Sequence, residues 1–226
     1  MRPIARLLVC TGLTVLFAGI AVAKDPETKS AWPPAPVRVD GTADQWAGHL
    51  APLPDVPILL GVENDGAYLY LCLKTSDPKV KEQIAHLGMT VWVNGAGKDD
   101  RGYGVRFPMG AGLRRGRGER PSAENAPAPD LASSIDDAKV ELIGPGVEDR
   151  FAVARADADP IQAALGDDAG VMVIELRFPL NPSENHPLAV EARPGATIAI
   201  GLETERPHPQ RHTHTGKGEG EGGEGD

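Results

Sequence analysis

Apolar and polar residues alternate along most of this chain, a period-two pattern that is typical of β-strands rather than helices. Residues 58–62 (ILLGV) follow this pattern, and residues 68–74 (YLYLCLK) are apolar on both of their faces. The turn sequence Asn64-Asp65-Gly66 separates the two segments and predicts an antiparallel hairpin. Because the second segment is apolar on both sides, we expect it to form a central strand of a β-sandwich.

Six further segments show strand patterns. The clearest are 171–178 and 197–204, where every second residue is a large aliphatic or aromatic side chain. The other four expected strands are 89–94, 103–107, 138–143 and 150–155. Many short strands joined by Gly- and Pro-rich turns favour a single all-β domain.

Two segments instead carry residues that typically begin and end a helix. Asp77-Pro78 begins a stretch that ends at Gly88, and Val80, Ile84 and Leu87 share one face of it. Asp159-Pro160 begins a second stretch, which runs through Leu165 to Gly166. We therefore expect two short helical connections that cover open ends of the sandwich.

The chain begins with the features of a secretory signal. Residues 1–23 hold two arginines, an apolar run and an Ala-Val-Ala cleavage site, and residues 24–35 form a polar, Pro-rich linker. Cleavage would leave Cys72 as the single cysteine, so no internal disulfide is expected. A periplasmic or secreted protein is the predicted location, with no transmembrane segment after signal cleavage.

Two segments lack any periodicity. Residues 109–134 are rich in Gly, Pro, Ala and Arg and predict a long mobile loop, and residues 206–226 predict a disordered tail rich in His, Gly and Glu. The β-sandwich domain is therefore expected over residues 36–205.

Three segments of the sequence resemble one known family. They are VRVDGTADQW (37–46), GVENDGAYLYLCLK (61–74) and MTVWVNGAGKDDRGYGVRFP (89–108). Their order resembles the carbohydrate-binding family 9-like, or DOMON-like, domains. The resemblance implies an antiparallel β-sandwich of immunoglobulin or jelly-roll type that recognises a saccharide-like ligand without catalysis. Some related domains bind haem, for which His49, His86, Met89 and Met109 are the available axial side chains.

Charge and motifs exclude several function classes. The full chain has a formal net charge of −9, and removing Arg2 and Arg6 with the signal leaves 21 basic against 32 acidic residues, or −11. Nucleic acid binding depends on basic contacts to phosphate, so it is not expected here. The sequence holds no nucleophile elbow, P-loop, dinucleotide fingerprint or zinc-protease motif, and we expect no enzyme.

Aromatic residues are the natural platforms for a sugar ring. Trp92, Asn94, Tyr103 and Arg106 are our candidate ligand-binding residues, because they cluster on one predicted hairpin. Strand alternation places Tyr103 and Arg106 on opposite faces, so the four cannot all share one surface. Trp46 is expected to pack against the edge of the sandwich. After Phe107 the only aromatics are Phe151 and Phe178, so the second aromatic with which sugar-binding relatives clamp a ligand is missing.

Metal ions and partner proteins give two further hypotheses. His208, His212 and His214 in the tail are candidate ligands for a transition metal, and Asn94, Asp99 and Asp100 offer oxygens to calcium. The alternative function is an envelope scaffold that binds a protein partner through the tail or through an arginine cluster. The cluster comprises Arg114, Arg115, Arg117 and Arg120.

Overall fold

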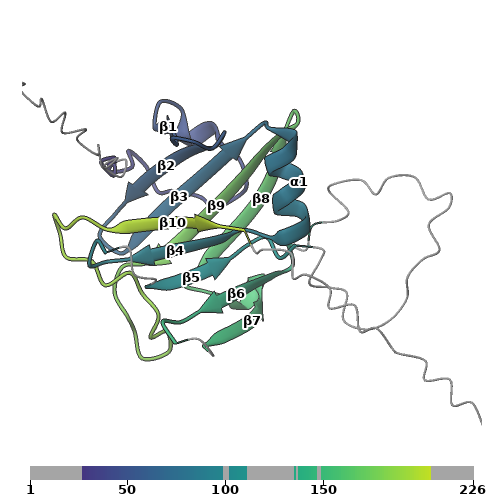
Figure 1. Cartoon of the computed structure of the whole chain (residues 1–226). Helices are drawn as coiled ribbons and strands as arrows, with labels where there is room; N and C mark the ends of the chain where they lie inside the picture. Colours follow the sequence, from purple (N-terminus) through teal and green to yellow (C-terminus); the bar gives the residue numbers. More distant parts are fainter. Residues whose placement is uncertain (1–26, 99–101, 111–134, 136, 147–148, 205–226) are drawn as a thin grey trace, which may run out of the picture.

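The protein folds into two antiparallel five-stranded sheets that pack face to face (Figure 1). This computed structural model describes residues 27–98, 102–110, 135, 137–146 and 149–204. Sheet 1 has the order β1 (Leu50–Pro52), β2 (Leu59–Asn64), β3 (Tyr68–Thr75), β9 (Val171–Pro179) and β8 (Gln162–Asp168). Sheet 2 has the order β10 (Ala199–Glu203), β4 (Thr90–Asn94), β5 (Tyr103–Arg106), β6 (Lys139–Ile143) and β7 (Arg150–Ala154). The predicted all-β sandwich class is therefore confirmed.

The main core lies between the sheets and is built from alternate residues of each strand. Leu69, Leu71 and Leu73 of β3 face Val91 and Val93 of β4 and their neighbours, and all of them are buried. The opposite side of β3 is buried as well, in a smaller cluster on the outer face of sheet 1. Since β3 lies between β2 and β9, its prediction as a central strand is confirmed.

Helix α1 (Pro78–Leu87) begins after Asp77 and ends before Gly88, as the sequence predicts. The Asp77 carboxylate accepts hydrogen bonds from the backbone N–H groups of Lys79 and Val80, and Gly88 ends the helix with a φ of 74°. Ile84 and Ala85 are buried against the sandwich. The first helical connection is confirmed.

The second predicted helix, from Asp159 to Gly166, is wrong. Residues Gln162–Asp168 form strand β8, which pairs with β9 along its whole length, after a 3-10 turn at Arg155–Asp157. A helix this short is marginal by itself, whereas strand pairing gives every residue a neighbour on β9. Asp159 caps nothing, because its carboxylate instead accepts a hydrogen bond from Arg177 at 2.8 Å.

The other strand predictions hold within two residues. The expected strands at 138–143, 150–155, 171–178 and 197–204 correspond to β6, β7, β9 and β10. Strand β1 was not predicted, because its three residues are too few to show a pattern. Within the described residues no helix has the length and apolar character that a bilayer crossing requires.

Candidate functional site

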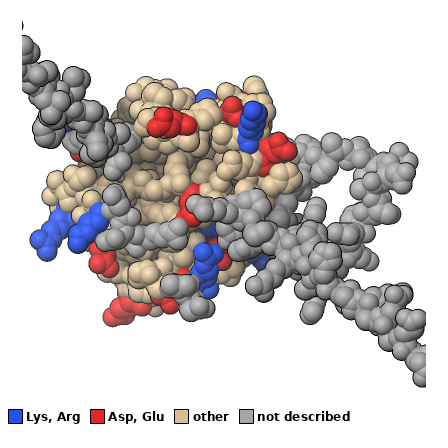
Figure 2. All heavy atoms as spheres, viewed as in Figure 1, with Lys and Arg blue, Asp and Glu red and all other residues tan. Residues whose placement is uncertain are grey.

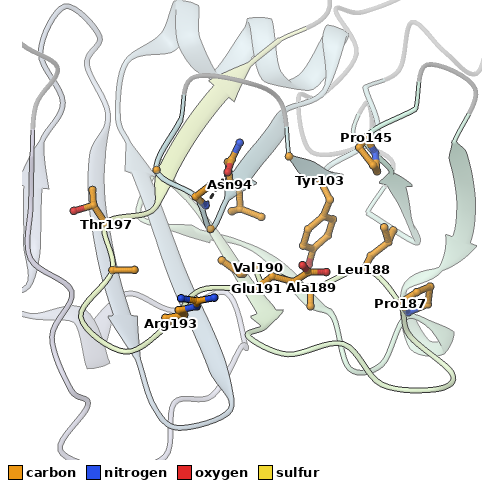
Figure 3. A pocket seen from close by; sticks show the side chains of 16 residues that line it. Asn94, Tyr103, Pro145, Pro187, Leu188, Ala189, Val190, Glu191, Arg193 and Thr197 are labelled. Atoms are coloured by element: carbon orange, nitrogen blue, oxygen red, sulfur yellow. Dashed lines mark hydrogen bonds between the residues drawn. The ribbon is translucent and has the colours of Figure 1, made fainter.

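A pocket of about 750 Å³ opens at one end of the sandwich. One wall is the turn that follows β4, and the other is the segment that leads from β9 toward β10 (Figure 3). Its polar lining consists of Asn94, Tyr103, Glu191, Arg193 and Thr197, and its apolar lining includes Val93, Pro145, Pro187, Leu188 and Val190. A concave site with a few convergent polar groups is the usual form of a small-molecule binding site.

Glycines allow the two walls of this pocket to approach each other closely. A Cβ atom on Gly95 would lie 2.0 Å from the Val190 carbonyl oxygen, and one on Gly97 would lie 2.6 Å from the Thr197 carbonyl oxygen. Gly97 also has a φ of +66°, which favours glycine. The Asn94 side chain accepts a hydrogen bond from the Ala96 N–H at 2.9 Å and fixes the turn. The pocket rim is therefore set by backbone packing before any ligand arrives.

The second wall is held by hydrogen bonds to the last residue of β9 and the residue that follows it. The Val190 N–H donates to the Pro179 carbonyl and the Glu191 N–H donates to the Leu180 carbonyl, each at 2.9 Å. Glu191 has a φ of 57°, a left-handed conformation that is uncommon for a residue other than glycine. Such conformations cost about 1–3 kcal/mol and concentrate at functional sites. The wall thus places a carboxylate at the pocket by means of a strained backbone.

Tyr103 brings a buried hydroxyl to the pocket. The side chain points from β5 toward the segment that carries Val190 and Glu191 (Figure 3), and its ring packs edge-on against Phe178 at 5.8 Å between centroids. The residue is only 4% exposed, and its hydroxyl has no hydrogen-bond partner among the described groups. Burial raises the pKa of this phenol, so it stays protonated. A buried hydroxyl without a partner costs about 1–3 kcal/mol.

The four predicted ligand residues divide between two surfaces. Asn94 and Tyr103 line the pocket, while Trp92 and Arg106 lie on the outer face of sheet 2. The expectation that the four residues cannot share one face is confirmed. That any of them binds a ligand stays a prediction.

On the outer face, Trp92 and Arg106 are both engaged with neighbouring groups. The Trp92 ring covers Gly104, where an added Cβ would lie 2.8 Å from the indole, and its N–H donates to the Glu203 carboxylate at 2.9 Å. Arg106 is 1% exposed and donates to the Leu87 carbonyl. Trp92 is half-buried and does not line the pocket.

Trp46 has the packing role that was expected, but it lies over the inner strands of sheet 1 and not at the edge of the sandwich. Its side chain is fully buried in the cluster on the outer face of sheet 1, beside Tyr70, Cys72 and Val173. The indole N–H donates to the Glu175 carboxylate at 2.7 Å. Burial raises the pKa of the Cys72 thiol to about 12, with the nearby carboxylates adding to the effect, so this cysteine is not a reactive thiolate.

Several predicted sites lie outside the described residues. These are the tail histidines His208, His212 and His214, the acids Asp99 and Asp100, and the arginine cluster at 114–120. Among the residues that the structure does describe, no group of three or more His, Cys, Asp or Glu side chains is placed to hold a metal ion.

The histidines and methionines considered for haem lie in two places. His49 contacts Glu63 in sheet 1, whereas His86, Met89 and Met109 lie near the end of α1, where the Met89 N–H donates to the Pro108 carbonyl. The Met89 side chain is buried in the core. Figure 2 shows acidic and basic side chains interspersed on the viewed face, so no strong field of one sign is apparent among the described residues there.

Sequence reasoning missed the wall at 187–197. Glu191 and Arg193 follow no strand or helix pattern, and Thr197 only begins the expected strand at 197–204, so periodicity did not select them as a site. One signal was available, because residues 179–196 form a long connection between two clear predicted strands, and long connections in compact domains are usually functional.

No protein-family model matches the chain, and a search of curated proteins finds no match. The pocket and its geometry are thus the basis for any statement about function.

Proposed function

We propose that this protein is a non-catalytic recognition module of the periplasm or extracellular space, whose end pocket takes a small saccharide-like ligand. The observation that carries the proposal is the mixed polar and apolar lining of the pocket, in whose wall the Tyr103 hydroxyl lies buried without a partner among the described groups. A ligand hydroxyl that reaches it when the side chains above it shift would satisfy a group that otherwise lowers the stability of the domain.

The polar groups around the pocket suit a polyhydroxylated molecule. Glu191 accepts hydrogen bonds, Arg193 donates them, and Asn94 can do both, so neighbouring sugar hydroxyls would find complementary partners. The apolar side chains of Leu188 and Val190 provide surface for the C–H groups of a sugar ring. The volume of about 750 Å³ lies within the usual range for small-molecule sites and holds a mono- or disaccharide.

The rigidity of the rim supports binding rather than catalysis. The close approaches at Gly95 and Gly97 fix both walls, which reduces the entropy lost when a ligand is ordered. Glu191 and Tyr103 form no nucleophile and base pair, since the phenol is protonated and no serine, cysteine or histidine lines the pocket among the described residues.

The test is a glycan array probed with the mature chain, 24–226, followed by calorimetry on each ligand found. Tyr103→Phe should weaken binding roughly three- to tenfold, the effect of one lost hydrogen bond, without lowering stability. Glu191→Gln should weaken it more, by about tenfold or greater, because hydrogen bonds to a charged group are stronger. Tyr68→Phe and Glu184→Gln remove the same groups outside the pocket and should leave affinity unchanged.

Trp92→Ala separates the pocket from the outer face of sheet 2. Affinity that survives Trp92→Ala but falls in Tyr103→Phe places the ligand in the pocket. Affinity that is lost in Trp92→Ala and kept in Tyr103→Phe would assign the ligand to the indole of Trp92 and contradict the pocket assignment. An array without any saturable ligand would overturn the saccharide proposal altogether.

A further inference from the structure

Strand β7 is an exposed edge of sheet 2. It is the last strand in the order β10-β4-β5-β6-β7 and lies at the lower border of the sheet in Figure 1. Four of its five residues are exposed, and Val153 is half-buried. The Phe151 side chain is 57% exposed, an unusual fraction for a large aromatic residue. This strand therefore presents apolar surface and an accessible backbone together.

The direction of its backbone groups follows from the pairing with β6. The Gly144 N–H donates to the Asp149 carbonyl and the Arg155 N–H donates to the Ala138 carbonyl, at the two ends of the ladder. Because hydrogen-bonded pairs alternate in an antiparallel ladder, Phe151 and Val153 direct their backbone groups toward β6. The N–H and C=O groups of Arg150, Ala152 and Ala154 consequently point away from the sheet.

The edges of sheet 1 are protected in ways that β7 is not. Strand β1 has only three residues and ends in Pro52, which lacks an N–H group. Strand β8 ends in Asp167 and Asp168, and the backbone of Gly41 packs closely against its Gly166. Short strands, prolines and charges of this kind prevent edge-to-edge pairing. Strand β7, Arg-Phe-Ala-Val-Ala, contains neither proline nor lysine nor an acidic residue.

We propose that β7 pairs with β7 of a second copy of this chain, antiparallel, about a two-fold axis at Ala152. This register places Ala152 opposite Ala152 of the second copy and Arg150 opposite its Ala154, so the outward backbone groups meet as hydrogen-bonded pairs. Phe151 then lies opposite Val153 of the second copy, in the non-hydrogen-bonded position where side chains approach most closely.

The strand is self-complementary in this register. Each Phe151 gains a β-branched neighbour, an arrangement that stabilises antiparallel pairs, and no two like charges lie directly opposite. The two sheets would join into one continuous sheet with the same side facing each core. A closed two-fold dimer uses the β7 edge of both copies, so no β7 edge remains for further growth. Since one five-residue strand buries little area, the dimer should be weak and depend on concentration.

Sedimentation velocity over a wide range of concentration tests the proposal on the mature chain. A reversible monomer–dimer equilibrium is expected, and Phe151→Lys should raise its dissociation constant by about tenfold, because two apolar cross-strand pairs are lost and two cations are brought together. Trp32→Lys, the same change at another exposed aromatic residue away from β7, should leave the equilibrium unchanged. Since Phe151 is exposed, the substitution leaves the core intact.

Disulfide trapping tests the register. Ala152→Cys should form a covalent dimer under a mild oxidant, whereas Asp168→Cys on the edge of sheet 1 should not. A protein that stays monomeric at all concentrations, or equal cross-linking of both variants, overturns the proposal. So does a monomer whose Ala152 amide is protected from hydrogen exchange, because another segment of the same chain would then cover the edge.

Discussion

The outer faces of the two sheets carry the same pair of groups in different surroundings. Each face has a tryptophan lying over a glycine, Trp46 over Gly61 and Trp92 over Gly104. Each indole N–H donates to a glutamate, Glu175 at 2.7 Å and Glu203 at 2.9 Å. Trp46 is fully buried, whereas Trp92 is half-buried and Glu203 is exposed.

The difference comes from what covers sheet 1. Residues 37–46, which we call the clasp, lie over its outer face and converge on Glu175. That carboxylate is 1% exposed and accepts hydrogen bonds from the N–H groups of Asp40 and Gly41 as well as from the Gln45 amide. On sheet 1 every donor of the clasp satisfies a buried charge, so the Trp46–Glu175 pair stabilises the fold. On sheet 2 the Trp92–Glu203 pair lies at the surface.

The two tryptophans should differ most strongly in their effect on stability. Trp46→Ala should lower the free energy of unfolding by about 3–5 kcal/mol, since it removes a fully buried aromatic ring and a donor to Glu175. Trp92→Ala should lower it by about 1–2 kcal/mol, because part of the ring already contacts solvent. Urea denaturation followed by circular dichroism measures both, and equal losses would remove the distinction between the two faces.

Substitution of the two glutamates should show the same contrast in stability, with smaller losses. Glu175→Gln should destabilise the protein by about 2–3 kcal/mol, because an amide cannot accept all four hydrogen bonds and carries no charge. Glu203→Gln should change stability by less than about 0.5 kcal/mol. Amide hydrogen exchange at Gly41 should accelerate in Glu175→Gln alone. A clasp that stays protected in that variant would show that the indole and not the carboxylate holds it.

Acid should loosen the clasp, with the smallest effect of the three. Hydrogen bonds from the Thr42 side chain, together with its backbone N–H and the charge of Arg38, outweigh burial and lower the pKa of Asp40. A lowered folded-state pKa gives stabilisation that is present above the unfolded value, about 4, and lost as pH falls through the folded value. Asp40→Asn should therefore reduce the melting temperature slightly at pH 7, and this difference should vanish near pH 2. An equal difference at both pH values would contradict the assignment.

Much of the fold could be predicted because it depends on alternation. Strands β3, β9 and β10 carry large side chains on every second residue, and their register follows from which side faces the core. The segment at 162–168 was misjudged because Asp-Pro and Gly are equally typical of helix ends and of turns between strands. Only pairing with β9, a contact that sequence alone does not reveal, decided between the two.

The pocket could be predicted only in part. Tyr103 and Asn94 were selected from the β4–β5 hairpin, and they do line it. Glu191 and Arg193 come from a connection that contacts the hairpin through close glycine approaches, and nothing in the local sequence encodes such a contact. Alternation separated Tyr103 from Arg106, correctly, but could not show that the tyrosine is the one of the two that lines the pocket.

The position of Glu175 has a consequence for the order of folding. The clasp is separated from its anchor by 135 residues between Asp40 and Glu175, so no local contact can fix it early. Bringing such distant segments together costs loop-closure entropy, and contacts of this kind form late in folding. Until β9 takes its place in sheet 1, Trp46 lacks both the Glu175 acceptor for its N–H group and the Val173 side chain beside its ring. Closure of the clasp on Glu175 therefore reports that β9 has joined sheet 1.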